Sequence, residues 1–187
     1  MTEPNPDQSQ PLFDALDAWT AGTSHQDAAT AALPRPRSVS DGARVELREI
    51  THESVREICR LAVGAGQHRF VAPNAVSLAE AHYSPEAWPR AVYADNVPVG
   101  FAMLSIDEAK AEYFLWRFMI AAPFQRLGFG EAALRLIVDH VRTLPGATAF
   151  MTSWVPAEGG PEPFYRGFGF EPTGEVDDGE VIGRLPL

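Results

Sequence analysis

The sequence predicts a domain of the α/β (α+β) class, with a mixed, mostly antiparallel sheet that changes character at a central strand and helices that flank it. Segments with strand and helix patterns follow one another in the order β-α-α-β-β-β-α-β-α-β, without an internal repeat. The central strand, Tyr113 to Ile120, leads through a glycine-containing turn, Gln125 to Gly130, into a long amphipathic helix. The other elements are arranged around this strand, turn and helix.

Composition and charge narrow the class of protein. With 187 residues, 45% of them hydrophobic, the chain can bury one core of ordinary size. The net charge of −10 argues against binding to nucleic acid and favours a cationic substrate. Cys59 is the single cysteine, which excludes an internal disulfide framework. No histidines accompany it at metal-ligand spacing, so we expect a structural thiol and no metal.

The first 42 residues differ in composition from the rest of the chain. They are rich in Pro, Ser, Thr, Asp and Ala, which predicts a flexible N-terminal extension over residues 1–42 and a domain over residues 43–187. The pattern from Leu12 to Trp19 fits a short amphipathic helix. No apolar run reaches the length of a membrane span, and Met1 to Pro6 lacks the features of a signal peptide, so we expect a cytoplasmic protein with no membrane partner.

The first half of the domain begins with a strand and two helices. Val45 to Ile50 alternates as a strand does, and Thr51 is the expected cap of a helix over residues 55–62. A glycine-containing loop then leads to a short helix, Ser77 to Ala81. Loops of this kind lie at the surface and often carry the substrate-specific part of a site.

A β-hairpin precedes the central strand. Within this hairpin, from Trp88 to Ser105, the strands Ala91 to Ala94 and Val97 to Leu104 flank Asp95-Asn96, a pair that tolerates the left-handed backbone of a tight turn. The helix after the central strand is expected to stop at Pro145-Gly146. Its apolar positions recur at helical spacing and are Leu134, Ile137, Val138, Val141 and Leu144.

The C-terminal part supplies a strand, a short helix and closing strands. Residues 147–155 read as the strand, and Pro161 begins a helix that carries Tyr165. The closing strands surround an acidic turn, Asp177 to Gly179.

The turn between the central strand and its helix predicts an anion-binding corner. Free N–H groups at a helix N-terminus and glycines without a Cβ both favour a bound anion. A nucleoside-triphosphate loop is excluded, because Gly130 is followed by Glu131 and not by Lys. Gly128 to Ala133 matches a dinucleotide fingerprint, but the strand over residues 147–155 lacks the acid that would hold the ribose. A turn that only packs the helix on the sheet is the structural alternative.

The same turn resembles a known superfamily. Gln125, Gly128 and Gly130 fit Gln/Arg-x-x-Gly-x-Gly/Ala, the signature of the GNAT superfamily of N-acetyltransferases. A hairpin before the central strand and a tyrosine-bearing helix before Gly167 to Phe170 also fall where that superfamily has them. The resemblance extends over about residues 44–187.

A narrower resemblance concerns the acceptor. Leu115 to Ile120, Phe70 to Asn74 and Ser77 to Ala81 look like segments of the bacterial diamine and spermine/spermidine acetyltransferases. This implies a small-molecule amine, a polyamine or diamine, that attacks acetyl-CoA directly. Acetylation of a protein N-terminus or lysine, or a non-catalytic acyl-CoA-binding module, are the alternatives. A homodimer is common in the superfamily.

The resemblance implies acetyl-CoA as co-substrate, without a metal. Amides of the turn would hold its pyrophosphate, the backbone of Phe118 and Ile120 would pair with the pantetheine amides, and an amide near Met119 would polarise the thioester carbonyl. The expected cofactor-binding residues are Phe118, Met119, Ile120, Gln125, Arg126, Leu127, Gly128, Phe129, Gly130 and Glu131.

The resemblance also suggests catalytic and acceptor residues. Tyr165 matches the tyrosine that gives a proton to the departing thiolate, although an aromatic residue there could simply fill the core. Glu112 is the first candidate for the base that takes a proton from the amine, directly or through water, and Glu80 and Glu86 could hold a second cationic group. Each acid could instead be solvated surface. Glu158 occupies the position of an asparagine that often contacts the cofactor.

Overall fold

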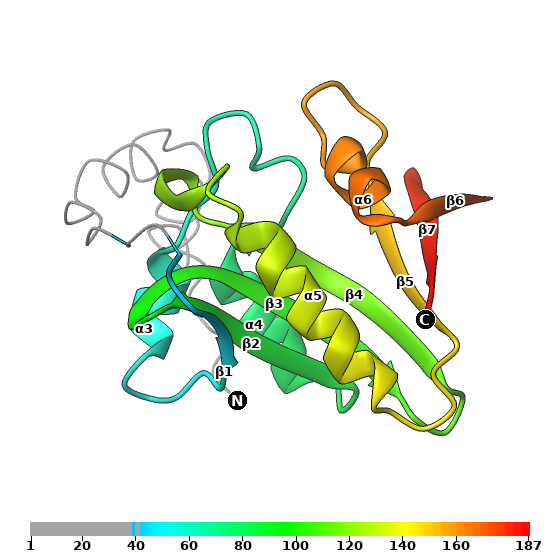
Figure 1. Ribbon diagram of the computed structural model, residues 1–187, viewed down its shortest axis with the longest axis horizontal. Coiled ribbons are helices and arrows are strands. Elements are labelled where there is room, and N and C mark those ends of the chain that lie inside the picture. The colour runs from blue at the N-terminus through cyan, green and yellow to red at the C-terminus, as the bar shows by residue number, and fades with distance from the viewer. Residues whose placement is uncertain (1–38, 40–41) are drawn as a thin grey trace, which may run out of the picture. The chain divides into compact units, whose positions relative to one another are not determined.

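The computed structural model describes residue 39 and residues 42–187 (Figure 1). Apart from residues 39 and 42, the predicted extension over residues 1–42, with its short helix, lies outside the described residues. The described strands are β1 (Val45–Arg48), β2 (Ala87–Ala94), β3 (Val97–Asp107), β4 (Glu112–Ile120), β5 (Ala149–Trp154), β6 (Glu171–Asp177) and β7 (Glu180–Pro186). The helices are α3 (Val55–Arg60), α4 (Asn74–His82), the 3-10 turn η2 (Ala122–Phe124), α5 (Phe129–Arg142) and α6 (Glu162–Phe168).

All seven strands belong to one sheet in the order β1-β2-β3-β4-β5-β7-β6. Neighbouring strands are antiparallel except for β4 and β5, which are parallel. The predicted fold class is therefore confirmed, and the change of character falls at the central strand β4. In Figure 1, α5 lies across one face of the sheet, where it contacts β1 and β4, while α3 and α4 lie against the opposite face.

The predicted amphipathic helix packs as its spacing requires. In α5, Leu134, Ile137 and Val141 are fully buried and Val138 nearly so, whereas Leu144 follows the helix end. Burial of four such side chains contributes several kcal/mol through the hydrophobic effect, at about 1.5–3 kcal/mol each.

Two local predictions have different outcomes. The hairpin turn is confirmed, since Ala94 pairs with Val97 and Asp95 has a φ of +54°. The predicted cap at Thr51 is wrong, because α3 begins at Val55 after Ser54. The Thr51 hydroxyl donates instead to the carboxylate of Glu53, at 2.6 Å.

The two halves of the sheet separate after a short contact between β4 and β5. The only residue pairs that join them in the described chain are Phe114↔Met151 and Leu115↔Thr152. At the next residue, Trp116, a β-bulge interrupts the pairing of β4 with β3. From Trp116 to Ile120, β4 therefore has a neighbour on one edge only, and the opening beside it is where the candidate site lies.

Gly100 allows β3 to lie close to the end of β4. A Cβ at this position would lie 2.5 Å from the Met119 carbonyl oxygen and 2.7 Å from Ile120 Cδ1. Since a backbone carbonyl cannot turn aside as a side chain can, we expect Gly100→Ala to lower the free energy of unfolding by about 1–3 kcal/mol. Chemical denaturation measures this change.

Gly167→Ala is the matched control. Gly167 lies within α6, and an added Cβ would have no atom within 4 Å. Removing a glycine from a helix interior is expected to raise stability by up to about 1 kcal/mol. Equal stability of Gly100→Ala and wild type would contradict the tight approach of β3 to β4.

Candidate active site

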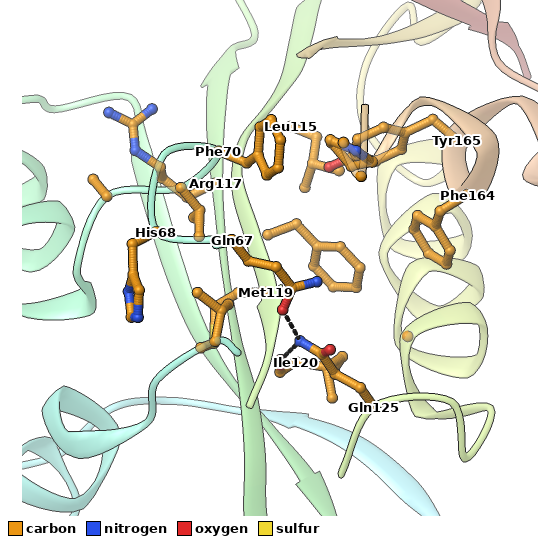
Figure 2. A pocket seen from close by; sticks show the side chains of 18 of the residues that line it. Gln67, His68, Phe70, Leu115, Arg117, Met119, Ile120, Gln125, Phe164 and Tyr165 are labelled. Carbon is orange, nitrogen blue, oxygen red and sulfur yellow. Dashed lines mark hydrogen bonds between the residues drawn. The ribbon is translucent and has the colours of Figure 1, made fainter. Parts of the chain in front are cut away.

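A cavity of about 670 Å³ lies where β4 and β5 diverge (Figure 2). Its walls come from the loop after α3, from β4, from the first turn of α5, and from β5, α6 and β7. The lining residues are 63, 67–72, 115–120, 124–126, 128, 130, 131, 153, 159–161, 164, 165 and 180. Residues far apart in the sequence thus share one cavity that is open to solvent.

The N-terminus of α5 presents free backbone donors to this cavity. Gly128 caps the helix with a φ of +84°, and Arg126 just before it has a φ of +63°. The first helical hydrogen bond runs from the Ala132 amide to the Gly128 carbonyl, at 3.1 Å. The amides from Arg126 to Glu131 have no acceptor within the described part of the chain. With the positive end of the helix dipole, they can bind an anion.

The expected cofactor residues of this turn do not all face the cavity. Gln125, Arg126, Gly128, Gly130 and Glu131 line it. The two others point elsewhere: Leu127 is 57% exposed and Phe129 is buried in the core.

Gln125 acts as a clamp at the end of β4. Its side-chain amide donates to the Ile120 carbonyl at 2.8 Å and to Oε1 of Gln67 at 2.9 Å, as Figure 2 shows. The same Gln67 oxygen accepts the Gly64 amide at 2.9 Å. Gln125 therefore fastens the loop after α3 to the anion-binding turn, a role for Gln67 that no sequence signal indicated.

The register of β4 decides which backbone groups face the opening. The Ala121 amide donates to the Val99 carbonyl of β3 at 2.8 Å. Because backbone groups alternate along a strand, those of Met119 also point toward β3, and those of Phe118 and Ile120 point toward the cavity. The amides available to polarise a carbonyl there are thus those of Phe118 and Ile120, and the register does not support the Met119 amide in that role.

Tyr165 lies in an aromatic cluster at the cavity wall. Only 6% of it is exposed, and its ring centroid lies 5.7 Å from those of Trp154 and Phe170. Burial raises the pKa of Tyr165 to about 12, a hydrogen bond with Thr152 opposes this rise, and the charge of Glu180 adds to it. The phenol therefore stays protonated at neutral pH and could act as a donor, while its ring fills the core.

Thr152 places this cluster at the point where the strands part. Its hydroxyl donates to the Leu115 carbonyl of β4 at 3.3 Å, and it is almost completely buried. The same threonine lies near enough to the Tyr165 phenol to oppose the rise in its pKa. Packing against Trp154 and Phe170 holds the phenol at the wall of the cavity.

The structure does not bring the predicted acids into the cavity. Glu112 is exposed at the first residue of β4, three residues, or about 10 Å, from Leu115. Glu80 pairs with Arg117 at 3.1 Å, and Glu86 is exposed before β2. None of the three lines the cavity. Which acids reach the cavity depends on the pairing and packing of segments far apart in the sequence, and a local sequence pattern does not reveal this.

Two other carboxylates line the cavity within the described residues. Glu131, in the first turn of α5, pairs with Arg135 at 2.5 Å. Glu180, at the start of β7, accepts a hydrogen bond from the hydroxyl of Ser153. The sequence drew attention to the acidic turn just before Glu180, but gave no sign that Glu180 itself reaches the site.

Glu158 and Cys59 stay outside the lining. Glu158 is exposed, and its carbonyl, not its carboxylate, is engaged, accepting a hydrogen bond from Arg69 at 2.8 Å. Cys59 is half-buried in α3, where burial raises the pKa of its thiol. Within the described residues, no group of three or more His, Cys, Asp or Glu side chains is arranged to hold a metal ion. No helix in that same part combines the length and apolarity needed to span a membrane.

Comparison with known proteins identifies the family. Residues 67–170, more than half of the 187 residues, match the model of the acetyltransferase (GNAT) family. The chain belongs to the GNAT family. It is an N-acetyltransferase, and its named relatives are N-acetyltransferases too. The resemblance to the GNAT superfamily that the glycine turn suggested is confirmed.

The relatives are distant. A spermine/spermidine N(1)-acetyltransferase of Bacillus subtilis (strain 168) is 25% identical over 145 residues, covering 74% of this GNAT chain and 95% of the relative. The solved PaiA N-acetyltransferase from Thermoplasma acidophilum, in complex with coenzyme A, has a TM-score of 0.60 at 14% identity, covering 77% of this chain and 99% of that one.

A second solved structure shares the fold. It is an N-acetyltransferase from Escherichia coli whose name gives a ribosomal-protein alanine as its acceptor. Its TM-score is 0.58 at 16% identity, covering 77% of this chain and 94% of that one. At these identities the likeness shows the fold, and GNAT neighbours with different acceptors share it.

Proposed function

We propose that this GNAT enzyme transfers the acetyl group of acetyl-CoA to a primary amine of a small molecule, a diamine or polyamine. One observation carries the proposal: Arg126, Gly128, Gly130 and Glu131, whose amides have no acceptor in the described part of the chain, line the same cavity as Tyr165. A diphosphate site and a proton donor in one space suit acyl transfer from coenzyme A. The names of the Bacillus relatives support the acceptor class.

The residues present fit coenzyme A in two respects. The amides at the start of α5 would hold the pyrophosphate, with Gly128 supplying the left-handed backbone that exposes them. The unpaired edge of β4 would pair with the pantetheine amides through Phe118 and Ile120. The bound thioester supplies an activated acetyl group.

The chain's own groups then serve the transfer. The amides of Phe118 and Ile120 face the cavity and can donate to a carbonyl oxygen that gains negative charge. The Tyr165 hydroxyl can give its proton to the departing sulfur. Cys59 lies outside the cavity lining, so the amine is expected to attack directly, with no acyl-enzyme.

Acetylation of a protein amino-terminus is the second candidate. Two acids expected to hold further positive charges are not in the cavity, which favours this candidate. Glu80 is engaged in an ion pair with Arg117, and Glu86 is exposed. A polyamine would carry several positive charges into a cavity whose described carboxylates are Glu131 and Glu180 alone. An acceptor with one ammonium group needs only one of them.

Thiol release with acetyl-CoA and a panel of amines tests the proposal. The panel contains spermine, spermidine, putrescine, lysine and a peptide with a free amino-terminus. We expect the highest kcat/KM for the polyamines and the diamine. Turnover of the peptide alone would favour the second candidate, and thiol release with none of the amines would refute acetyl transfer to amines.

Gly128→Asp should weaken acetyl-CoA binding at least 10-fold. The carboxylate would face the bound phosphates, and a residue with a Cβ is strained at this φ of +84°. Isothermal titration calorimetry measures the affinity. Gly174→Asp is the matched control, since Gly174 has a φ of +90° with open space around it and lies outside the cavity lining. Unchanged affinity in Gly128→Asp would count against the pyrophosphate site.

Tyr165→Phe should lower kcat about 100-fold while acetyl-CoA affinity stays within about twofold, because the ring is kept and only the proton donor is lost. The folded-state pKa of about 12 exceeds the ordinary value near 10, so the protonated phenol persists as the pH rises. The contribution of the phenol to activity should therefore be lost only as the pH approaches 12, whereas stability should fall between about pH 10, where the phenol ionises in the unfolded chain, and pH 12. Steady-state kinetics across pH test this, and an unchanged kcat would remove the assignment.

A further inference from the structure

Glu180 is held in place by the closing hairpin. It begins β7 directly after a tight turn in which Asp178 and Gly179 have φ values of +45° and +80°. Antiparallel pairing of Trp154 with Val181 then sets Glu180 beside the end of β5. There the Ser153 hydroxyl donates a hydrogen bond to its carboxylate. The side chain is thus fixed by register and by a specific donor.

This carboxylate and the Tyr165 phenol share one wall of the cavity. Ser153, Tyr165 and Glu180 all belong to the lining, and they come from β5, α6 and β7 on the side opposite β4. The charge of Glu180 is felt at the Tyr165 hydroxyl. A group that can receive a proton and a group that can give one therefore line the same cavity, as acyl transfer to an ammonium requires.

The competing groups are less well placed. Glu131 lies in the first turn of α5, at the anion-binding end, and is engaged by Arg135. His68 belongs to the lining but stands exposed on the loop after α3. The ionisable groups that line the cavity with Glu180 are His68, Arg69, Arg117, Arg126, Glu131 and Tyr165.

We propose that Glu180 is the base that accepts a proton from the acceptor's ammonium group, with Ser153 as the residue that positions its carboxylate. This inference rests on the proposed function. It replaces Glu112, which the fold leaves outside the cavity lining.

The protons and bonds balance as follows. The ammonium gives one proton to the Glu180 carboxylate, directly or through one water, and the freed lone pair forms the N–C bond to the acetyl carbon. The C–S bond breaks, and the sulfur takes a proton from Tyr165. The new amide nitrogen loses a second proton, which restores the Tyr165 hydroxyl, while Glu180 releases its proton to solvent. The products are the acetylamide, the free thiol and one proton.

Glu180→Gln tests the role. The amide keeps the volume and an acceptor for Ser153 but cannot take the proton. With the most active amine of the panel, we expect kcat/KM at pH 7 to fall about 100-fold, while the Kd of acetyl-CoA stays within about twofold. The difference in kcat/KM between Glu180→Gln and wild type should shrink steadily toward pH 10, because more of the amine then enters the site already deprotonated. A deficit of equal size at every pH would overturn the role of base.

The control is Asp177→Asn, which removes the same charge from the same hairpin at a residue outside the lining. Its kcat/KM should match wild type within about twofold. Glu180→Asp keeps a carboxylate and should keep the wild-type pH dependence at a lower rate. This second variant decides the question if Glu180→Gln does not fold, and a pH dependence unlike that of wild type would overturn the proposal.

The outcomes separate the two proposals. An active wild type with an equally active Glu180→Gln would overturn the assignment of Glu180 and leave amine acetylation standing. A wild type that releases thiol with no amine would overturn both.

Discussion

The short parallel contact between β4 and β5 is the constraint on which the site depends. Two residue pairs join the strands, and the next residue, Trp116, is a bulge. Longer pairing would satisfy the backbone of Phe118 and Ile120 within the sheet and close the cavity. Early divergence leaves these groups without a strand partner. Gln125 bonds to the Ile120 carbonyl, and the remaining groups cost free energy unless water or a ligand bonds to them.

The loop after α3 spans the mouth of the opening that results. Gln67 ties it to the clamp formed by Gln125, and Arg69 ties it to the carbonyl of Glu158 in the loop before α6. An added Cβ at Gly160 in that loop would lie 2.8 Å from the Ala157 carbonyl oxygen, which shows how tightly the second anchor is folded. The loop is therefore joined to the turn after β4 and to the loop after β5, and its composition is well placed to influence which acceptor enters.

Local patterns predicted most of the fold and the glycine turn that opens α5. The stripe of α5, the turn at Asp95 and the signature around Gly128 each depend on residues close in sequence, so helix periodicity, turn chemistry and motif spacing were sufficient. The acids could not be predicted in the same way. Glu112 and Glu180 both flank strand ends, and only the pairing of β5 with β7 brings Glu180 into the cavity lining. The Ser153 hydrogen bond and the Gln67 clamp likewise join segments that no local pattern relates.

The aromatic cluster around Tyr165 has a consequence for how the protein can evolve. Because the ladder between β4 and β5 is so short, buried side chains supply much of the cohesion between the two half-sheets, and Tyr165 packs among Leu115, Trp154 and Phe170 in that core. The same side chain is the proposed proton donor. Selection for folding and selection for turnover therefore act on one residue, so few substitutions there can be neutral. Changes of acceptor preference have more freedom at positions of the loop after α3 other than its anchors Gln67 and Arg69.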